Sequence, residues 1–251
     1  MVIKVIGIIK GDIRYKYLSD MINNYIISDK LIELKGIEEL LLPMNGINND
    51  YEIKGTTLNL LDIIKQNSIK RIYVGNSSKR LDELCDKYSI ELIKFLNGSF
   101  ILENAKLTAK GIIHYLCNNE NDISDYKILV VGYGNISYYL CDLLDVYDVK
   151  YAVLTLNETE KKFINLKSIK SEEMISGKGY DIIINTIPDN LDWDYSSLIN
   201  LRVIDVASSP FGFDIDKIIQ NNINYYIFSA IPSKYAPSTA AKILKNALKI
   251  N

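Results

Sequence analysis

Short apolar runs rich in β-branched residues alternate with segments of helical periodicity along the whole chain. Runs of this kind, bounded by turn-forming residues, are typical of buried strands. The alternation of strands and helices is the pattern of parallel α/β units. We expect strands at the following positions: Ile3–Ile9, Glu39–Pro43, Arg71–Gly75, Glu91–Phe95, Lys127–Val131, Tyr151–Leu156, Asp181–Asn185, Arg202–Val206 and Asn224–Phe228.

Several of the helical segments begin with residues that favour a helix start. Ser78 can accept a hydrogen bond from the first turn that follows it, and Pro237 stands in a first turn, where its missing N–H costs nothing. The expected helices are Ile13–Tyr25, Leu58–Gln66, Lys79–Tyr88, Ala105–Cys117, Ile136–Val146 and Pro237–Lys249.

A polar break at 118–122 separates two series of strands and helices. We therefore predict a two-domain α/β protein with parallel sheets. Residues 1–103 form a flavodoxin-like N-terminal domain for substrate or partner. Residues 104–251 form a Rossmann dinucleotide-binding domain that includes the C-terminal helix.

Composition excludes several classes of protein. Hydrophobic residues make up 48% of the chain, charged residues 24%, and the formal net charge is −2. Such a chain can bury a core and presents no basic face for nucleic acid. No apolar run approaches the roughly 20 residues of a membrane span, and the apolar start is too short for a signal peptide. We expect a cytoplasmic protein.

Histidine and cysteine are scarce, with one and three residues in the chain. The single histidine, His114, excludes His-based triads and multi-histidine metal sites, and we expect it in the core. Cys85, Cys117 and Cys141 have no metal-binding spacing, and we interpret them as small buried hydrophobes. No metal site is predicted.

The segment from Ile128 to Ser137 has the strongest local motif, a strand that runs into Gly132-Tyr-Gly134 and then a helix. This is the context of a dinucleotide fingerprint. Gly132 permits the tight turn, and Gly134 lets the backbone approach a pyrophosphate. The helix that opens at Asn135 and Ile136 directs free N–H groups at that anion. We predict cofactor contacts at Gly132, Gly134, Asn135 and Ile136.

The sequence does not identify the residue that binds the ribose of the cofactor. An acid at the end of the second Rossmann strand binds the 2′-hydroxyl, and an arginine accommodates a 2′-phosphate. Neither stands at the end of Tyr151–Leu156, where Thr155 and Asn157 suit either form. The choice between NAD and NADP therefore stays open. Further contacts are expected at the ends of the next strands, from Thr186, Ile187 and Pro188 and from Ala207 and Ser208.

Six segments together resemble one family, the A subunits of dipicolinate synthase, over nearly the whole chain. They are Gly11–Arg14, Leu41–Pro43, Val131–Gly134, Asp181–Pro188, Val203–Asp214 and Ile231–Leu244. The resemblance implies oxidation of a dihydrodipicolinate species to pyridine-2,6-dicarboxylate, with hydride passing to NADP (NAD is possible). It also implies the mother-cell cytoplasm of a sporulating bacterium and a flavoprotein-like B subunit as partner. We expect a homo-oligomer that binds no nucleic acid and no membrane.

The chain departs from the family's pattern at several positions, among them Lys10 and Phe211, which stand where the family has glycines. Ser137 replaces the last glycine of the fingerprint, and Leu156 falls where the family has an arginine after the second Rossmann strand. Lys110 and Ser209 replace a glutamate and an arginine. These departures support one alternative, a non-catalytic nucleotide-binding or scaffold subunit. A further alternative, which does not rest on them, is another NAD(P)-dependent 2-hydroxy or 2-amino acid dehydrogenase.

A dicarboxylate substrate needs cations, and guanidinium matches a carboxylate bidentately. Arg71 and Arg202 precede strands and should lie at the amino edge of a sheet, away from ligands. Arg14 follows the first strand and is our first candidate, ahead of Arg80. Asp12 either caps the following helix or contacts substrate and orients Arg14. We name Asp12 and Arg14 as the catalytic pair; the sequence does not identify the proton acceptor.

Overall fold

The computed structural model describes residues 5–120, 122–167, 169–172 and 175–250. The chain divides into two compact units. The first consists of Met1–Asn104 together with Pro232–Asn251, and the second is Ala105–Ile231. A change of unit near residue 104 was expected from the sequence, but the C-terminal helix lies in the first unit and not in the second.

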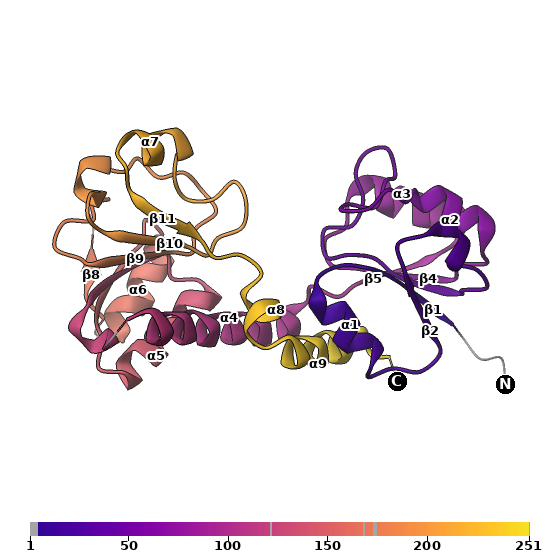
Figure 1. The fold of residues 1–251 in the computed structure, drawn as a ribbon, viewed down its shortest axis with the longest axis horizontal. Helices are drawn as coiled ribbons and strands as arrows, with labels where there is room; N and C mark the ends of the chain where they lie inside the picture. The colour runs from indigo at the N-terminus through magenta and orange to yellow at the C-terminus, as the bar shows by residue number, and fades with distance from the viewer. Residues whose placement is uncertain (1–4, 121, 168, 173–174, 251) are drawn as a thin grey trace. The chain divides into compact units, whose positions relative to one another are not determined.

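A five-stranded parallel sheet forms the first unit, in the order β2-β1-β3-β4-β5 (Figure 1). This is the flavodoxin-like order, as the sequence predicts. The strands are β1 (Ile6–Ile9), β2 (Tyr25–Ser28), β3 (Glu39–Leu41), β4 (Arg71–Val74) and β5 (Glu91–Lys94), and a short 3₁₀ helix, Leu31–Glu33, follows β2.

Helices cover both faces of this sheet because successive strand residues point to opposite sides. Ile9 packs on one face in a cluster with α2 (Leu60–Gln66) and α3 (Lys79–Tyr88). Ile8 packs on the other face with α1 (Ile13–Ser19) and α9 (Pro237–Leu248). The short helix α8 (Ile231–Tyr235) precedes α9, and α4 (Gly98–Asn119) leads into the second unit.

The C-terminal helix joins the first unit because its apolar stripe completes that unit's core. Ala241, Leu244 and Leu248 are buried in the same cluster as Tyr15 and Leu18 of α1. The Nζ of Lys245 donates to the backbone oxygen of Met21 at 2.8 Å. Assigning this helix to the second domain was therefore wrong. An apolar stripe in the sequence predicts that one face of a helix is buried, but it does not predict which sheet that face packs against.

The second unit is a six-stranded parallel sheet in the order β11-β10-β9-β6-β7-β8. Numbered from its first strand, this is the doubly wound Rossmann order, and the order reverses between β6 and β9. In Figure 1, α5 and α6 lie on one side of the sheet and α7 on the other. The elements are β6 (Lys127–Val131), α5 (Asn135–Val146), β7 (Lys150–Leu154), α6 (Glu158–Leu166), β8 (Ser171–Glu172), β9 (Ile182–Asn185), β10 (Arg202–Asp205), α7 (Ile215–Gln220), β11 (Asn224–Ile227) and the 3₁₀ helices Ile123–Asp125 and Tyr195–Leu198.

The first helix is shorter than the pattern predicts. It ends at Ser19, and Tyr25, the last residue of the expected helix, begins β2. Asn24 has a left-handed backbone with a φ of 56°, and its carbonyl accepts a hydrogen bond from the N–H of Ile6. The chain therefore reverses there and enters the sheet. Ile3 and Lys4, in the expected first strand, lie outside the described residues.

Two predictions of burial were wrong, both on α4. His114 and Cys117 are exposed, whereas Ile112, Ile113 and Leu116 point into the core. His114 lies 2.9 Å from the amide of Asn118, one helical turn on. Cys85 and Cys141 are buried as expected, and burial raises the pKa of the Cys85 thiol to about 11. Thiols this basic are poor nucleophiles.

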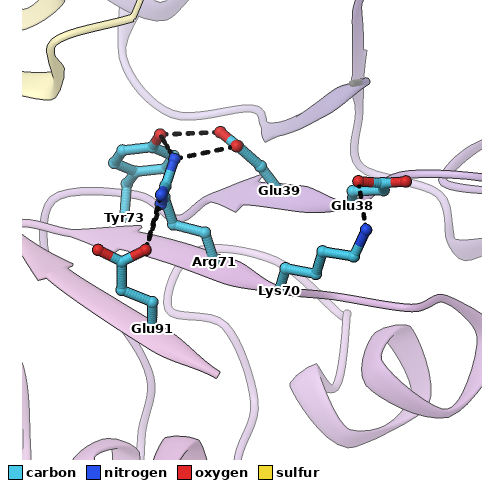
Figure 2. Close-up of polar contacts among 6 residues, drawn as sticks. All are labelled: Glu38, Glu39, Lys70, Arg71, Tyr73 and Glu91. Atoms are coloured by element: carbon cyan, nitrogen blue, oxygen red, sulfur yellow. Dashed lines mark hydrogen bonds and ion pairs between the residues drawn. The ribbon is translucent and has the colours of Figure 1, made fainter. Parts of the chain in front are cut away.

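An ion-pair cluster closes the amino edge of the first sheet (Figure 2). Arg71 lies 3.1 Å from a carboxylate oxygen of Glu39 and 2.7 Å from one of Glu91. The hydroxyl of Tyr73 donates to Glu39 at 2.8 Å. These contacts join the starts of β3, β4 and β5. Arg71 therefore has a structural role. It lies at the amino edge of the first sheet, where the sequence analysis predicts no ligand.

Arg202 begins β10 at the corresponding edge of the second sheet and pairs with Glu120. Among the helices that the structure describes, none is both long and apolar enough to cross a membrane.

Candidate dinucleotide site

The backbone turns sharply at Gly132, directly after β6. Its φ is +88°, a conformation that favours glycine. A Cβ at this position would lie 2.7 Å from both Thr186 Oγ1 and Ile187 Cγ1. Backbone conformation and space therefore both require glycine here, as the fingerprint interpretation expects.

Gly134 starts α5 and leaves its N-terminus open. It is the N-cap residue, no side chain caps the helix, and nothing lies within 4 Å of where a Cβ would be. Asn135 and Ile136 form the first turn, where backbone N–H groups lack partners inside the helix and carry a partial positive charge. This open cradle fits the pyrophosphate of a dinucleotide.

Ser137, at the third fingerprint position, keeps the helix close to the sheet. It is fully buried, and its hydroxyl lies 2.9 Å from the hydroxyl of Thr186. The Thr186 hydroxyl in turn donates to the backbone oxygen of Val131 at 2.8 Å. Serine thus preserves the packing that glycine usually provides. The Thr186 side chain ties β6, β9 and α5 together.

The end of β7 is organised around Thr155. Its side chain is buried, and its hydroxyl donates to Glu160 and accepts from the N–H of Asn157 at 3.1 Å. Asn157 caps α6 through Thr159 and Glu160. The side chain of Leu156 is exposed at 54%. The hydroxyl of Thr155 is thus already bonded within the protein, and its predicted cofactor contact remains a prediction.

Glu160 connects this strand end to the glycine turn. One of its oxygens, Oε2, accepts from both the Thr155 hydroxyl and the backbone N–H of Tyr133, the latter at 3.0 Å. Tyr133 is the residue between the two glycines. A carboxylate therefore lies at the carboxyl end of the second Rossmann strand, although the strand itself provides none.

The ends of β9 and β10 are joined through a buried carboxylate. Asp205 is fully buried, and its oxygens accept from Asn185 Nδ2, the N–H groups of Ala207 and Gly212, and the Tyr225 hydroxyl, all within 3.0 Å. The charge of Asp205 helps to raise the pKa of Tyr225 well above its usual range, after burial itself. Asp205 therefore holds loops and is not available to a ligand.

The predicted contact residues beyond these strands lie on neighbouring loops, since β9 and β10 pair in register. Ile187 is half-buried and Ala207 buried, while Pro188 and Ser208 are exposed. Ile187 is also tied to Asn185, whose side chain bonds both its N–H and its carbonyl. These positions lie at the carboxyl edge, where open α/β sheets bind ligands. Their contacts with a cofactor remain predictions.

Asp12 and Arg14 form a close pair at the start of α1. Asp12 caps the helix by accepting from the Arg14 N–H at 3.0 Å, which is one of the two roles expected for it. Arg14 Nε lies 2.9 Å from both oxygens of the carboxylate. Burial of Asp12 raises the pKa of its carboxyl, but the hydrogen bonds and charge of Arg14 outweigh this and hold it below its usual value. Asp12 is therefore ionised at neutral pH.

Two pockets adjoin these residues. A mostly apolar pocket of about 310 Å³ lies between α5 and α6, beside Tyr133 and Gly134. A second pocket of about 400 Å³ opens next to Asp12 and is lined also by Lys10 and Lys16. Arg14 does not line it, because its guanidinium is buried against Asp12 with only 8% of the side chain exposed.

Sequence reasoning missed Glu160. Glu160 is three residues after Asn157, a spacing that predicts a helix cap. Nothing in the local pattern signals its contact with Tyr133, which is 27 residues away.

No protein-family model matches the chain. It is 23% identical to the A subunit of dipicolinate synthase from Bacillus subtilis (strain 168) over 234 residues, which cover 86% of this chain and 78% of the relative. The crystal structure of the Bacillus subtilis protein superposes with a TM-score of 0.77 at 18% identity, over 99% of this chain and 95% of the other. The corresponding structure from Bacillus halodurans gives 0.76 at 20% identity, with 98% and 96% covered.

Dehydrogenases share the same fold more distantly. An NAD-dependent formate dehydrogenase from Staphylococcus aureus, solved in complex with NAD, gives a TM-score of 0.59 at 11% identity over 98% of this chain and 94% of the other. The resemblance seen in the sequence is thus confirmed, and the fold is that of dipicolinate synthase A subunits and of NAD-dependent dehydrogenases.

Proposed function

We propose that this protein is an NAD(P)-dependent oxidoreductase of the same type as the A subunits of dipicolinate synthase. It would oxidise a dihydrodipicolinate species to pyridine-2,6-dicarboxylate. One observation carries the proposal: an open glycine turn at the N-terminus of α5, in a chain that follows the fold of those proteins over 99% of its length.

The residues of the turn fit the cofactor. Gly134, Asn135 and Ile136 would hold the pyrophosphate, with the cradle at Gly134 left open by the missing Cβ. Ile187, Pro188, Ala207 and Ser208 would border the nicotinamide half from the neighbouring strand ends. When bound, the dinucleotide accepts a hydride from the ring that becomes aromatic. The protein's part is to position that ring and exclude water.

Asp12 and Arg14 are our candidates for the substrate side. Asp12 occupies the Nε and Nη2 of Arg14, which fixes the plane of the guanidinium. Since only 8% of this side chain is exposed and it does not line the pocket, we propose that a substrate carboxylate meets it at Nη1, from beside the pocket. A fixed fork loses less entropy on binding than a mobile side chain. Lys10 and Lys16 line the adjoining pocket and suit the second carboxylate.

The same relatives suggest the setting of the reaction. The Bacillus subtilis relative is named as one subunit of a synthase, which favours a partner, and we propose a flavoprotein-like B subunit. We further propose a homo-oligomer in the mother-cell cytoplasm of a sporulating bacterium.

The test is a binding titration followed by an assay. NAD⁺ and NADP⁺ are titrated separately into the purified chain, and a dihydrodipicolinate species is then supplied with the dinucleotide that binds. We expect reduced nicotinamide and pyridine-2,6-dicarboxylate to form in equal amounts, measured by absorbance and mass spectrometry. Binding without turnover, with the B-type partner present, would favour the scaffold alternative. Oxidation of a 2-hydroxy or 2-amino acid instead would favour the other dehydrogenase.

A further inference from the structure

Glu160 lies at the position where Rossmann folds bind the adenosine ribose of a dinucleotide. That place is the carboxyl end of the second strand, here β7. The carboxylate is held there from two sides, by the Thr155 hydroxyl at the strand end and by the Tyr133 N–H in the glycine turn. Its position relative to the turn is therefore fixed by hydrogen bonds and does not depend on a free rotamer.

The local sequence would lead one to expect a different use of this side chain. Asn157 and Glu160 have the spacing of a capping box, in which the glutamate reaches back to the N–H of the cap residue. In the structure that N–H donates to Thr155 Oγ1 at 3.1 Å, and Glu160 turns to the glycine loop. Both of its bonds use Oε2, so among the described residues Oε1 has no protein donor.

Among the described residues, no arginine makes a hydrogen bond or ion pair with Glu160 that could pass to a phosphate. Leu156 is exposed at the position where the family resemblance places one. Lys161, the nearest cation in sequence, lies 2.8 Å from Glu158 on the same helix. A 2′-phosphate here would meet a carboxylate, whereas a ribose hydroxyl would find an acceptor.

We propose that Glu160 is the residue that selects the cofactor, and that it makes this chain prefer NAD to NADP. The proposal rests on the dinucleotide site proposed above and adds which dinucleotide occupies it. Glu160 Oε1 accepts from a hydroxyl of the adenosine ribose, and the negative charge repels a 2′-phosphate. Like charges in contact at a binding site are a strong source of discrimination.

Calorimetric titration of the full chain tests this without any turnover. The probes are NAD⁺, NADP⁺, ADP-ribose and 2′-phospho-ADP-ribose; the last two isolate the ribose subsite from the nicotinamide. We expect the unphosphorylated member of each pair to bind about tenfold tighter or more. This measurement needs no variant, so it stands even if a variant fails to fold.

Glu160→Gln removes the charge and keeps an acceptor for Tyr133 and Thr155. We expect it to reduce the preference about tenfold, mainly because NADP⁺ binds better. Asp216→Asn is the control, because it removes an exposed negative charge from α7 of the same unit without touching the glycine loop or freeing Lys161 from Glu158. It should leave the ratio of the two affinities unchanged.

The outcomes separate the possible failures. Equal affinity for NAD⁺ and NADP⁺ in the natural chain would overturn the role of Glu160 and leave the dinucleotide site standing. A Glu160→Gln variant with a lower melting temperature and an equal loss of affinity for both dinucleotides would also overturn the role of Glu160. A purely structural contact affects both affinities alike. No binding of any probe would overturn the dinucleotide site itself, and this inference with it.

Discussion

Gly132 and Gly134 are two residues apart in one turn, but the structure gives them different tasks. Gly132 is required by its own backbone and by Thr186 and Ile187 behind it. Gly134 is required by nothing inside the protein, because no atom lies near its missing side chain. The open space at Gly134 lies at the uncapped N-terminus of α5, where an anion can approach the backbone N–H groups.

Gly134→Val should therefore lower dinucleotide affinity about tenfold or more, roughly 1.4 kcal/mol, with the fold intact. The branched side chain would stand in the pyrophosphate cradle. Gly132→Val is the contrasting variant: it should lower the melting temperature, since a Cβ there meets Thr186 Oγ1 at 2.7 Å. Calorimetry and circular dichroism measure the two effects. A folded Gly134→Val chain with unchanged affinity would reject the site.

Asp12 should make stability depend on pH in the acid range. The pKa of its carboxyl is held below 3.8 by Arg14, so the ionised form stabilises the fold. This contribution is fully present above the unfolded value and is lost as pH falls through 3.8 and below. Denaturant titrations at several pH values should show wild type and Asp12→Asn converging as the solution becomes acidic. A constant difference between them across that range would contradict the assignment.

At the scale of secondary structure, Asp205 joins three neighbouring parts of the second sheet. It receives hydrogen bonds from β9, from β11 and from the loop after β10. Gly212 packs so closely that a Cβ would lie 2.2 Å from the amide of Asn185. The carboxyl edge of this sheet is thus preformed by a single buried side chain.

Asp205→Ala would leave several buried donors without an acceptor, each at a cost of about 1–3 kcal/mol. We expect a loss of at least about 3 kcal/mol in the free energy of unfolding. Asp189→Ala, an exposed carboxylate on the adjacent loop, should change it by less than about 0.5 kcal/mol. Urea titration distinguishes the two, and similar midpoints would show that the buried network contributes little.

Periodicity alone predicted most strands of both sheets, because parallel strands buried on two faces read as continuous apolar runs. It missed the two-residue strand β8, and it failed at β2, which begins at Tyr25 after a turn with Asn24 in a left-handed conformation. Of the site, the sequence predicted the glycine turn and the Asp12 cap. It could not predict that Glu160 bonds Tyr133, because that contact depends on how β6 and β7 lie side by side.

At the scale of the whole molecule, the first unit is built from both ends of the chain. Its stability should therefore respond to substitutions near residue 244 that leave the second unit untouched. Leu244 is fully buried in the cluster with Tyr15 and Leu18.

Leu244→Ala should cost about 2–5 kcal/mol by removing buried methyl groups and leaving a cavity. Hydrogen exchange should rise in β1 and α1, at the other end of the sequence, and stay unchanged in β6 and β9. Leu140→Ala, fully buried on α5, is the reciprocal control and should affect the second unit only. Exchange that rises equally in both units would mean that they unfold together.

The split first unit also sets an order of events on the ribosome. Translation delivers all strands of the second unit by residue 231, whereas the first unit waits for α9. We therefore expect the second unit to complete its fold before the first, against the usual N-to-C order of domain folding. Until then the nascent sheet of β1–β5 presents Ile6, Ile8 and Leu41 without the helix that covers them. That interval is when chaperones would be needed most.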